Sequence, residues 1–290
     1  MCDDYTKQAE DAALARRGLS RRDFAALGAG AAIAGCAGTA TSAAQGGELT
    51  EQTVQITTED GIADAFFVHP AEGAHPGIVM WPDIAGLRDA KRIMARRLAA
   101  AGYSVLCVNQ YYRGGPPPME SFSEYRTPEG QARIKPLREA LTPEAIVRDA
   151  KAYVTFLDSS KAVDKARGIG SNGYCMGGPF TVRTAAARPD RVGAAASLHG
   201  GGLVTDAPDS PHRLLAKTKA AYLFAIARND DARSPGDKEA LRQAADAAGV
   251  KAEIEVYDAD HGWCVPDSPS YDPNAADRAW ERMLALFSGL

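Results

Sequence analysis

Cysteine and histidine are scarce in this sequence, and it has no excess of positive charge. Of 290 residues, five are cysteine and five are histidine, and the net charge is −4. So few cysteines cannot supply a disulfide framework, and the acidic balance leaves no basic surface for nucleic acid. The sequence also has no apolar run long enough to span a membrane and no repeat of fixed period. These absences exclude a disulfide-rich scaffold, a nucleic-acid-binding protein and a repeat array.

The composition is that of an ordinary globular protein with a sizeable core. Hydrophobic residues make up 45% of the chain and charged residues 24%, which is close to the average for soluble domains. A chain of this length suits one large domain and a shorter N-terminal stretch. We therefore expect an N-terminal segment at residues 1–44 and a single folded domain at residues 45–290.

The N-terminal segment has the order of features found in export signals. Arg21 and Arg22 precede an uncharged run rich in alanine and glycine, which resembles a twin-arginine signal, although a disordered tail is the alternative. Residues 33–36 look like a lipoprotein cleavage box, in which Cys36 would be lipidated and attach the protein to a membrane. Ordinary cleavage near residues 43–44 competes with lipidation. The signal predicts a periplasmic protein by either route.

From residue 51 onward, strand-like segments alternate with segments of helical periodicity. This alternation predicts an α/β fold with a mostly parallel central sheet and helices on both faces. We interpret residues 111–141 as a loop-rich excursion over the sheet edge. Strands are expected at 53–57, 63–68, 77–81, 103–109, 167–171, 192–198, 220–227 and 251–257, the first two as an antiparallel hairpin. Helices are expected at 90–101, 143–157, 176–187, 235–248 and 274–287.

The strongest chemical signal is the run Gly-Tyr-Cys-Met-Gly-Gly at residues 173–178, between an expected strand and an expected helix. This context is typical of a nucleophile elbow, a sharp turn that projects its central side chain into the cleft. Gly173 and Gly177 supply the small neighbours that the turn needs. The positive end of the following helix favours the thiolate of Cys175. We therefore predict that Cys175 is a nucleophile; a buried structural cysteine is the alternative.

A nucleophile at such a turn needs a histidine later in the chain as its base. His261 follows the last expected strand and precedes the last expected helix, which is the position of the base in this fold. His199 also follows a strand but lies too early in the chain. We interpret it either as a loop histidine or as a residue that lines the cleft.

The carboxylate that orients the base should lie between the nucleophile and the histidine. The strand expected at 220–227 is followed by two adjacent carboxylates, Asp230 and Asp231. The spacing to Pro235 favours Asp231, and Asp230 is the alternative. Only one of the two can face His261.

These groups together predict covalent catalysis on an ester carbonyl. The acid orients His261, which takes the proton of Cys175, and the thiolate forms an acyl-enzyme that water cleaves. The oxyanion needs backbone N–H donors from Met176 and from the loop after the strand at 77–81, where we expect Ile84 to donate.

These motifs resemble the dienelactone hydrolase (carboxymethylenebutenolidase) family of α/β-hydrolases, over residues 51–290. The cysteine in the elbow is the specific part of the match, since most α/β-hydrolases have serine there. The resemblance implies an α/β-hydrolase fold and a monomeric hydrolase without cofactors that cleaves strained or activated cyclic esters. The expected substrate is therefore a small ester or lactone.

Three residues near the expected site differ from, or only partly match, the pattern that the resemblance implies. Asp83 stands where the family has a glutamate that helps to convert the cysteine to thiolate; here it either modulates Cys175 or fixes its own loop. Arg113 matches one of two arginines that bind the substrate carboxylate. The second arginine is missing, and Trp263 in that region suggests a more apolar substrate.

Other functions share the same residues. An acyltransferase or a peptidase would use the same triad with another acceptor or leaving group, and a thiol sensor would use Cys175 alone. A metal site is not expected, because the histidines and cysteines lack ligand spacing. Cys107 and Cys264 would either pair as a disulfide or remain as two half-buried thiols.

Overall fold

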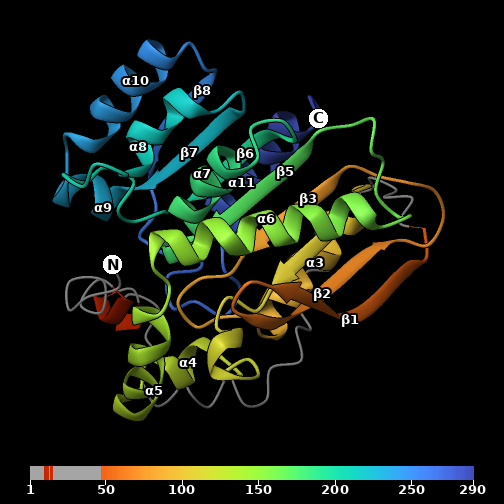
Figure 1. Cartoon of the computed structure of the whole chain (residues 1–290). Helices are drawn as coiled ribbons and strands as arrows, with labels where there is room; N and C mark the ends of the chain where they lie inside the picture. The colour runs from red at the N-terminus through yellow and green to blue at the C-terminus, as the bar shows by residue number, and fades with distance from the viewer. Residues whose placement is uncertain (1–9, 13, 16–46) are drawn as a thin grey trace.

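The computed structural model describes residues 10–12, 14–15 and 47–290 of the chain (Figure 1). The predicted twin-arginine pair, Cys36 and the expected cleavage sites lie outside these residues. In the described part of the chain, no helix is both long and apolar enough to cross a membrane.

The domain begins with the antiparallel hairpin that the sequence predicts. β1 (Leu49–Thr58) and β2 (Gly61–Pro70) pair along their whole length. The turn between them ends at Gly61, whose φ of 135° is disfavoured for residues with a side chain. β2 alternates polar and apolar residues only at its start. From Ala65 to Val68 every residue of β2 is buried, because this part of the strand pairs with β4 in the main sheet.

The described residues form one eight-stranded sheet in the order β1-β2-β4-β3-β5-β6-β7-β8. The strands from β3 to β8 are mutually parallel, and β2 alone runs antiparallel to them, because it pairs antiparallel with both β4 and β1. The prediction of a mostly parallel sheet is therefore confirmed. β3 lies between β4 and β5, so the strand order reverses there, where sites form at the carboxyl ends of strands. These strands are β3 (Gly77–Trp81), β4 (Ser104–Val108), β5 (Ile169–Tyr174), β6 (Val192–Leu198), β7 (Ala221–Ala227) and β8 (Ala252–Tyr257).

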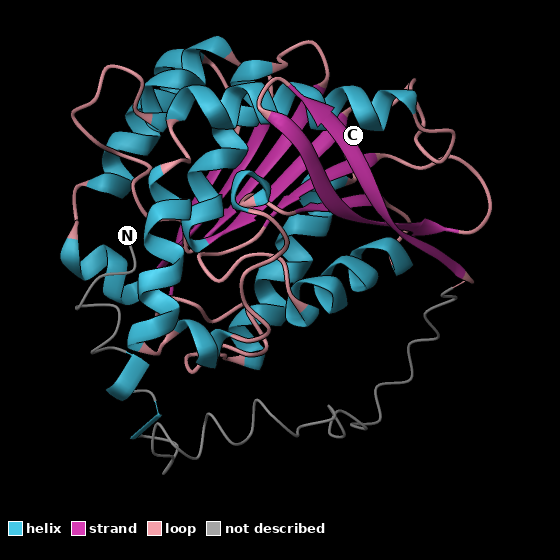
Figure 2. Ribbon diagram, turned by 60° about the horizontal axis from the view of Figure 1, so that its bottom comes forward, coloured by secondary structure: helices cyan, strands magenta, loops and turns pink. Residues whose placement is uncertain are grey.

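Helices cover both faces of the twisted sheet, as Figure 2 shows. One core cluster joins the sheet to α6, α7 and α10, and a second joins it to α3 and α11. Thr142 caps α6, because its side chain accepts the backbone N–H of Ala145 at 3.2 Å. The bounds are α3 (Asp89–Ala100), α6 (Pro143–Ser159), α7 (Gly178–Ala187), α10 (Asp237–Ala248) and α11 (Pro273–Phe287), with shorter helices α8 (Pro211–Leu214), η3 (Leu215–Lys217) and α9 (Arg228–Arg233).

Residues 111–141 are not the loop-rich excursion that the sequence predicts. They contain η1 (Tyr112–Gly114), α4 (Phe122–Tyr125) and α5 (Pro128–Glu139). Pro128 stands at the start of α5, where it is compatible with a helix, and Thr127 caps the helix by accepting the N–H of Gly130. Apolar residues of this segment form a third cluster with the loop after β3. The segment therefore packs over the carboxyl ends of the strands.

Candidate active site

The sharp turn that the sequence predicts at residues 173–178 follows β5. Cys175 has a φ of 54°, an uncommon backbone conformation for a residue with a side chain, and opens the short helix η2 (Cys175–Gly177) before α7. A Cβ on Gly173 would lie 2.1 Å from the carbonyl oxygen of Gly177, and one on Gly177 would lie 2.5 Å from that of Pro82. The turn therefore excludes any larger residue at either glycine.

His261 lies in the same pocket as Cys175 and is held from two sides. Its Nδ1 lies 2.6 Å from the Asp230 carboxylate, and its backbone N–H donates to the side chain of Asn229 at 2.8 Å. Burial alone would lower the pKa of His261. The Asp230 carboxylate and the Cys175 sulfur outweigh burial and raise this pKa well above its usual range. A histidine between a carboxylate and a thiol is suited to hold the proton of the thiol.

The choice of Asp231 as the orienting carboxylate is wrong in this structure. Asp230 contacts the histidine, whereas Asp231 forms an ion pair with Lys238 of α10, with its two oxygens 2.9 and 2.8 Å from Nζ. The chain turns into α9 directly after β7, so successive side chains point about 100° apart around the helix. The rotation directs Asp230 towards His261 and Asp231 towards α10. The spacing to Pro235 does not contain this information.

His199 forms the back of the pocket. It has a φ of 42°, and its Nδ1 accepts the backbone N–H of Cys175 at 3.1 Å. Its ring lies 4.8 Å from the His261 ring and 5.0 Å from the Trp263 ring, between centroids. Burial lowers the pKa of His199 well below its usual range, and His261 lowers it further. His199 is therefore neutral, with Nδ1 as the acceptor, and it supports the elbow rather than acting as a simple loop residue.

Asp83 lies in the pocket wall within a buried charge cluster. Its carboxylate receives two hydrogen bonds from Arg88, at 2.8 and 3.0 Å, and lies 2.9 Å from Nζ of Lys91. Burial would raise the pKa of Asp83, but these two cations hold it well below its usual range. Asp83 also accepts the backbone N–H of Ala85 at 2.9 Å, which is the predicted loop-fixing contact. The carboxylate is thus ionised and held by cations in a pocket that Cys175 also lines.

The two expected oxyanion donors flank the elbow. Ile84 and Met176 belong to one apolar cluster under α4. The hydroxyl of Tyr111 connects them, because it donates to the carbonyl oxygen of Ile84 at 2.8 Å and lies 3.9 Å from the Met176 sulfur. The loop after β3 therefore lies beside the turn after β5, as adjacent parallel strands require.

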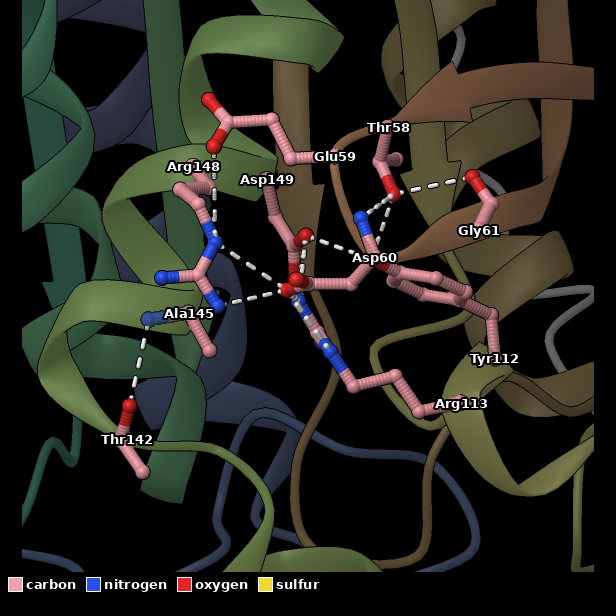
Figure 3. A network of polar contacts seen from close by, with 10 residues as sticks. All are labelled: Thr58, Glu59, Asp60, Gly61, Tyr112, Arg113, Thr142, Ala145, Arg148 and Asp149. Carbon is pink, nitrogen blue, oxygen red and sulfur yellow. Dashed lines mark hydrogen bonds and ion pairs between the residues drawn. The ribbon is translucent and has the colours of Figure 1, made fainter.

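Arg113, predicted to contact the substrate, is not among the residues that line the pocket. Its guanidinium donates to Asp149 at 2.9 and 2.8 Å and to Asp60 at 2.5 Å, in the network of Figure 3. Arg148 joins this network by donating to Asp60, and Tyr112 by donating to Asp149. The network ties the β1–β2 turn to α6. Asp60 and Asp149, which are far apart in the sequence, thus both form ion pairs with Arg113.

Trp263 also lies outside the pocket lining, contrary to the sequence prediction. It is fully buried and stacks on Tyr257 with centroids 5.1 Å apart and an interplanar angle of 15°. Its ring also meets the ring of His199 edge to face. Trp263 therefore supports His199 from behind rather than facing a substrate.

The pocket also contains residues that the sequence analysis did not select. Phe122 comes from α4, and Val265 and Ser268 come from the loop after His261. Glu10 comes from the N-terminal segment, and no sequence pattern indicates its position. The full lining is Glu10, Asp83, Phe122, Cys175, His199, His261, Gly262, Val265 and Ser268.

The other two described cysteines are free and buried. Burial raises the pKa of Cys107 to about 12 and raises that of Cys264 as well. Both are therefore protonated thiols, and the disulfide considered from the sequence is not formed. In the part of the chain that the structure describes, no group of three or more His, Cys, Asp or Glu side chains could hold a metal ion.

The parallel sheet with covering helices and the elbow after β5 define the α/β-hydrolase fold. The profile of the "Dienelactone hydrolase family" matches residues 63–290, and the chain belongs to this family of hydrolases.

Relatives agree with this assignment. The chain is 29% identical to the "Putative carboxymethylenebutenolidase" of Methylorubrum extorquens, over 93% of this chain and 92% of that one. It is 26% identical to the "Carboxymethylenebutenolidase" of Rhodococcus opacus, over 81% of this chain and 90% of the other. A crystal structure titled "Putative Dienelactone Hydrolase" from Klebsiella pneumoniae superimposes with a TM-score of 0.72 and 26% identity, covering 84% of this chain and all of that one.

Proposed function

We propose that this hydrolase cleaves carboxylic esters or lactones through a Cys175–His261–Asp230 triad and an acyl-enzyme. The observation that carries the proposal is the placement of His261, with Asp230 2.6 Å from Nδ1 and Cys175 in the same pocket. This order of carboxylate, imidazole and nucleophile is the one that covalent acyl transfer needs. The carboxymethylenebutenolidase names of the relatives agree with a lactone as substrate.

The acylation step transfers the acyl group from oxygen to sulfur. His261 takes the proton of Cys175, and the thiolate attacks the carbonyl carbon of the ester. The carbonyl electron pair moves to the oxygen, which accepts hydrogen bonds from the backbone N–H groups of Met176 and Ile84. Collapse of this intermediate breaks the ester C–O bond, and His261 gives its proton to the departing alcohol. In a lactone the alcohol stays attached to the acyl group.

The deacylation step returns the enzyme to its starting state. His261 takes a proton from water, and the hydroxide attacks the thioester carbon. The C–S bond breaks, the carboxylic acid leaves, and Cys175 is reprotonated or forms a pair with the imidazolium. Asp230 stabilises the imidazolium in both steps without taking a proton itself.

The test is a panel of p-nitrophenyl esters and lactones with wild type and Cys175→Ala. Loss of a triad nucleophile should lower kcat by about 10⁴ to 10⁶. Cys107→Ala is the matched control, because Cys107 is a buried thiol far from the elbow in sequence and should leave kcat unchanged. Retention of activity in Cys175→Ala with every ester would reject the mechanism. Added alcohols or amines would reveal acyl transfer as a second product.

We also propose that residues 1–44 direct export through the twin-arginine route. The support is the Arg21-Arg22 pair before an uncharged run. The double variant Arg21→Lys, Arg22→Lys should retain the protein in the cytoplasm, and an unchanged periplasmic yield would reject this route. Cys36→Ala should release the mature protein from membranes if Cys36 is lipidated, whereas a wild-type protein that is already soluble would indicate ordinary cleavage.

A further inference from the structure

A short N-terminal stretch of the chain lies at the catalytic pocket. Residues 10–12 and 14–15 are helical, and we call them the N-terminal turn (red in Figure 1). Glu10 is 5% exposed and Leu14 is 1% exposed, whereas Ala12 and Ala15 are exposed. Positions four residues apart lie on the same face of a helix. One face of the turn is therefore buried against the domain, and the other faces solvent.

The buried face of the turn enters the wall of the pocket itself. Glu10 lines the same pocket as Cys175 and His261. Its ionisation responds to both residues, because the charge of His261 lowers the pKa of Glu10 and that of Cys175 raises it. Burial is the largest cause, and the pKa of Glu10 rises to about 7. The carboxyl group of Glu10 thus forms part of the wall of the pocket that an ester substrate would have to enter.

Arg126 holds the N-terminal turn in place. Its guanidinium donates to the Glu10 carboxylate at 2.8 Å and to the side chain of Asp11. Arg126 directly follows α4, and Phe122 of the same helix lines the pocket. The side chains of Arg126 and Glu10 are only 9% and 7% exposed, so the ion pair is largely shielded from solvent. The contact therefore links the N-terminal turn to the segment that packs over the strand ends.

We propose that the surface around Arg126 and Phe122 is a docking site for the chain's own N-terminal turn, which closes the catalytic pocket in the full-length chain. Glu10 is the pocket occupant, and Leu14 is the apolar anchor. Substrate reaches Cys175 only when the turn leaves. This inference rests on the proposed function, because it assigns the closed pocket to ester cleavage. Loss of residues 1–44 during export would remove the turn and open the site.

Two readouts on the full-length chain test the closed state. The first is the limiting rate at high pH at which iodoacetamide alkylates Cys175, where the thiol is fully ionised and the rate reports access alone. The second is kcat/KM for a p-nitrophenyl ester. Leu14→Asp places a charge in a buried apolar contact and should release the turn. Glu10→Ala should act in the same direction, because it removes both the occupant and the ion pair. Ala12→Asp adds the same charge on the exposed face and is the matched control.

We expect Leu14→Asp and Glu10→Ala to raise both rates by about tenfold or more, since release of a dominant closed state increases the open population by that factor. Ala12→Asp should stay within about twofold of wild type. Equal alkylation rates in wild type and both release variants would overturn the closure. A faster alkylation without hydrolysis of any ester would support the closure and reject the proposed function. The thermal unfolding midpoint of each variant confirms that the domain remains folded.

Discussion

Replacement of Asp230 by asparagine should almost abolish ester hydrolysis, although the change removes only one charge. Asp230 accepts the hydrogen at Nδ1 of His261, so Nε2 is free to take the proton of Cys175. An amide can donate to Nδ1 and then stabilises the wrong tautomer, which cost about 10⁴ in kcat when the corresponding change was made in a serine protease. A factor of about 10⁴ corresponds to roughly 5 kcal/mol of transition-state stabilisation. We expect a loss of this size here.

Asp231→Asn is the matched control for this prediction. It removes the same charge from the next residue, whose partner is Lys238 rather than the histidine. Both side chains of that pair are partly exposed, at 19% and 33%, so its loss should cost at most about 1 kcal/mol of stability. The assay is kcat for a p-nitrophenyl ester near neutral pH, together with thermal unfolding of both variants. If Asp231→Asn were the inactive variant, the triad derived from the structure would be wrong.

Removing the pKa-raising carboxylate has a second measurable effect, on the titration of His261. Asp230 raises the pKa of the imidazole against the opposing effect of burial. Asp230→Asn should therefore lower this pKa, so that the ring loses its proton at a lower pH than in wild type. Proton NMR titration of His261 would measure the shift. An unchanged titration would mean that Asp230 does not interact with the ring in solution.

Three further substitutions test the surroundings of the triad. His199→Phe keeps a ring but leaves the backbone N–H of Cys175 without its acceptor, so the free energy of unfolding should fall by about 1–3 kcal/mol. A lower Tm together with a lower kcat would agree with this role, and an unchanged kcat would mean that His199 does not position the elbow. Asp83→Asn leaves two buried cations near the thiol, so Cys175 should react faster with iodoacetamide at neutral pH; superimposable rate profiles against pH would leave only the loop-fixing role. Arg113→Met leaves the buried Asp149 with the Tyr112 hydroxyl but without its cation, which should lower the free energy of unfolding by about 3–5 kcal/mol, whereas KM should stay within about twofold. A strong rise in KM with unchanged stability would instead support the substrate contact.

The local sequence predicts most of the elements, since their signals lie within a few residues. β3 and β6 begin and end where expected. β5 is different, because it extends to Tyr174 through Asn172 and Gly173, which disfavour strands. Pairing with β3 on one side and β6 on the other stabilises these residues as a strand. Tertiary contacts thus override local propensity at the site itself.

The order of Cys175, an aspartate and His261 along the chain, together with the small residues of the elbow, was sufficient to predict the family. That information is local, because a sharp turn accepts only certain residue types. Only the tertiary structure decided between Asp230 and Asp231, since the choice depends on the phase of a helical turn. The position of the Arg113 side chain likewise depends on the tertiary structure, because Arg113 forms ion pairs with Asp149 and Asp60, which lie far from it in the sequence. The position of Glu10 in the pocket that Cys175 lines has no signal in the sequence, because its ion pair with Arg126, 116 residues further along the chain, depends on the shape and charge of a surface that exists only after folding.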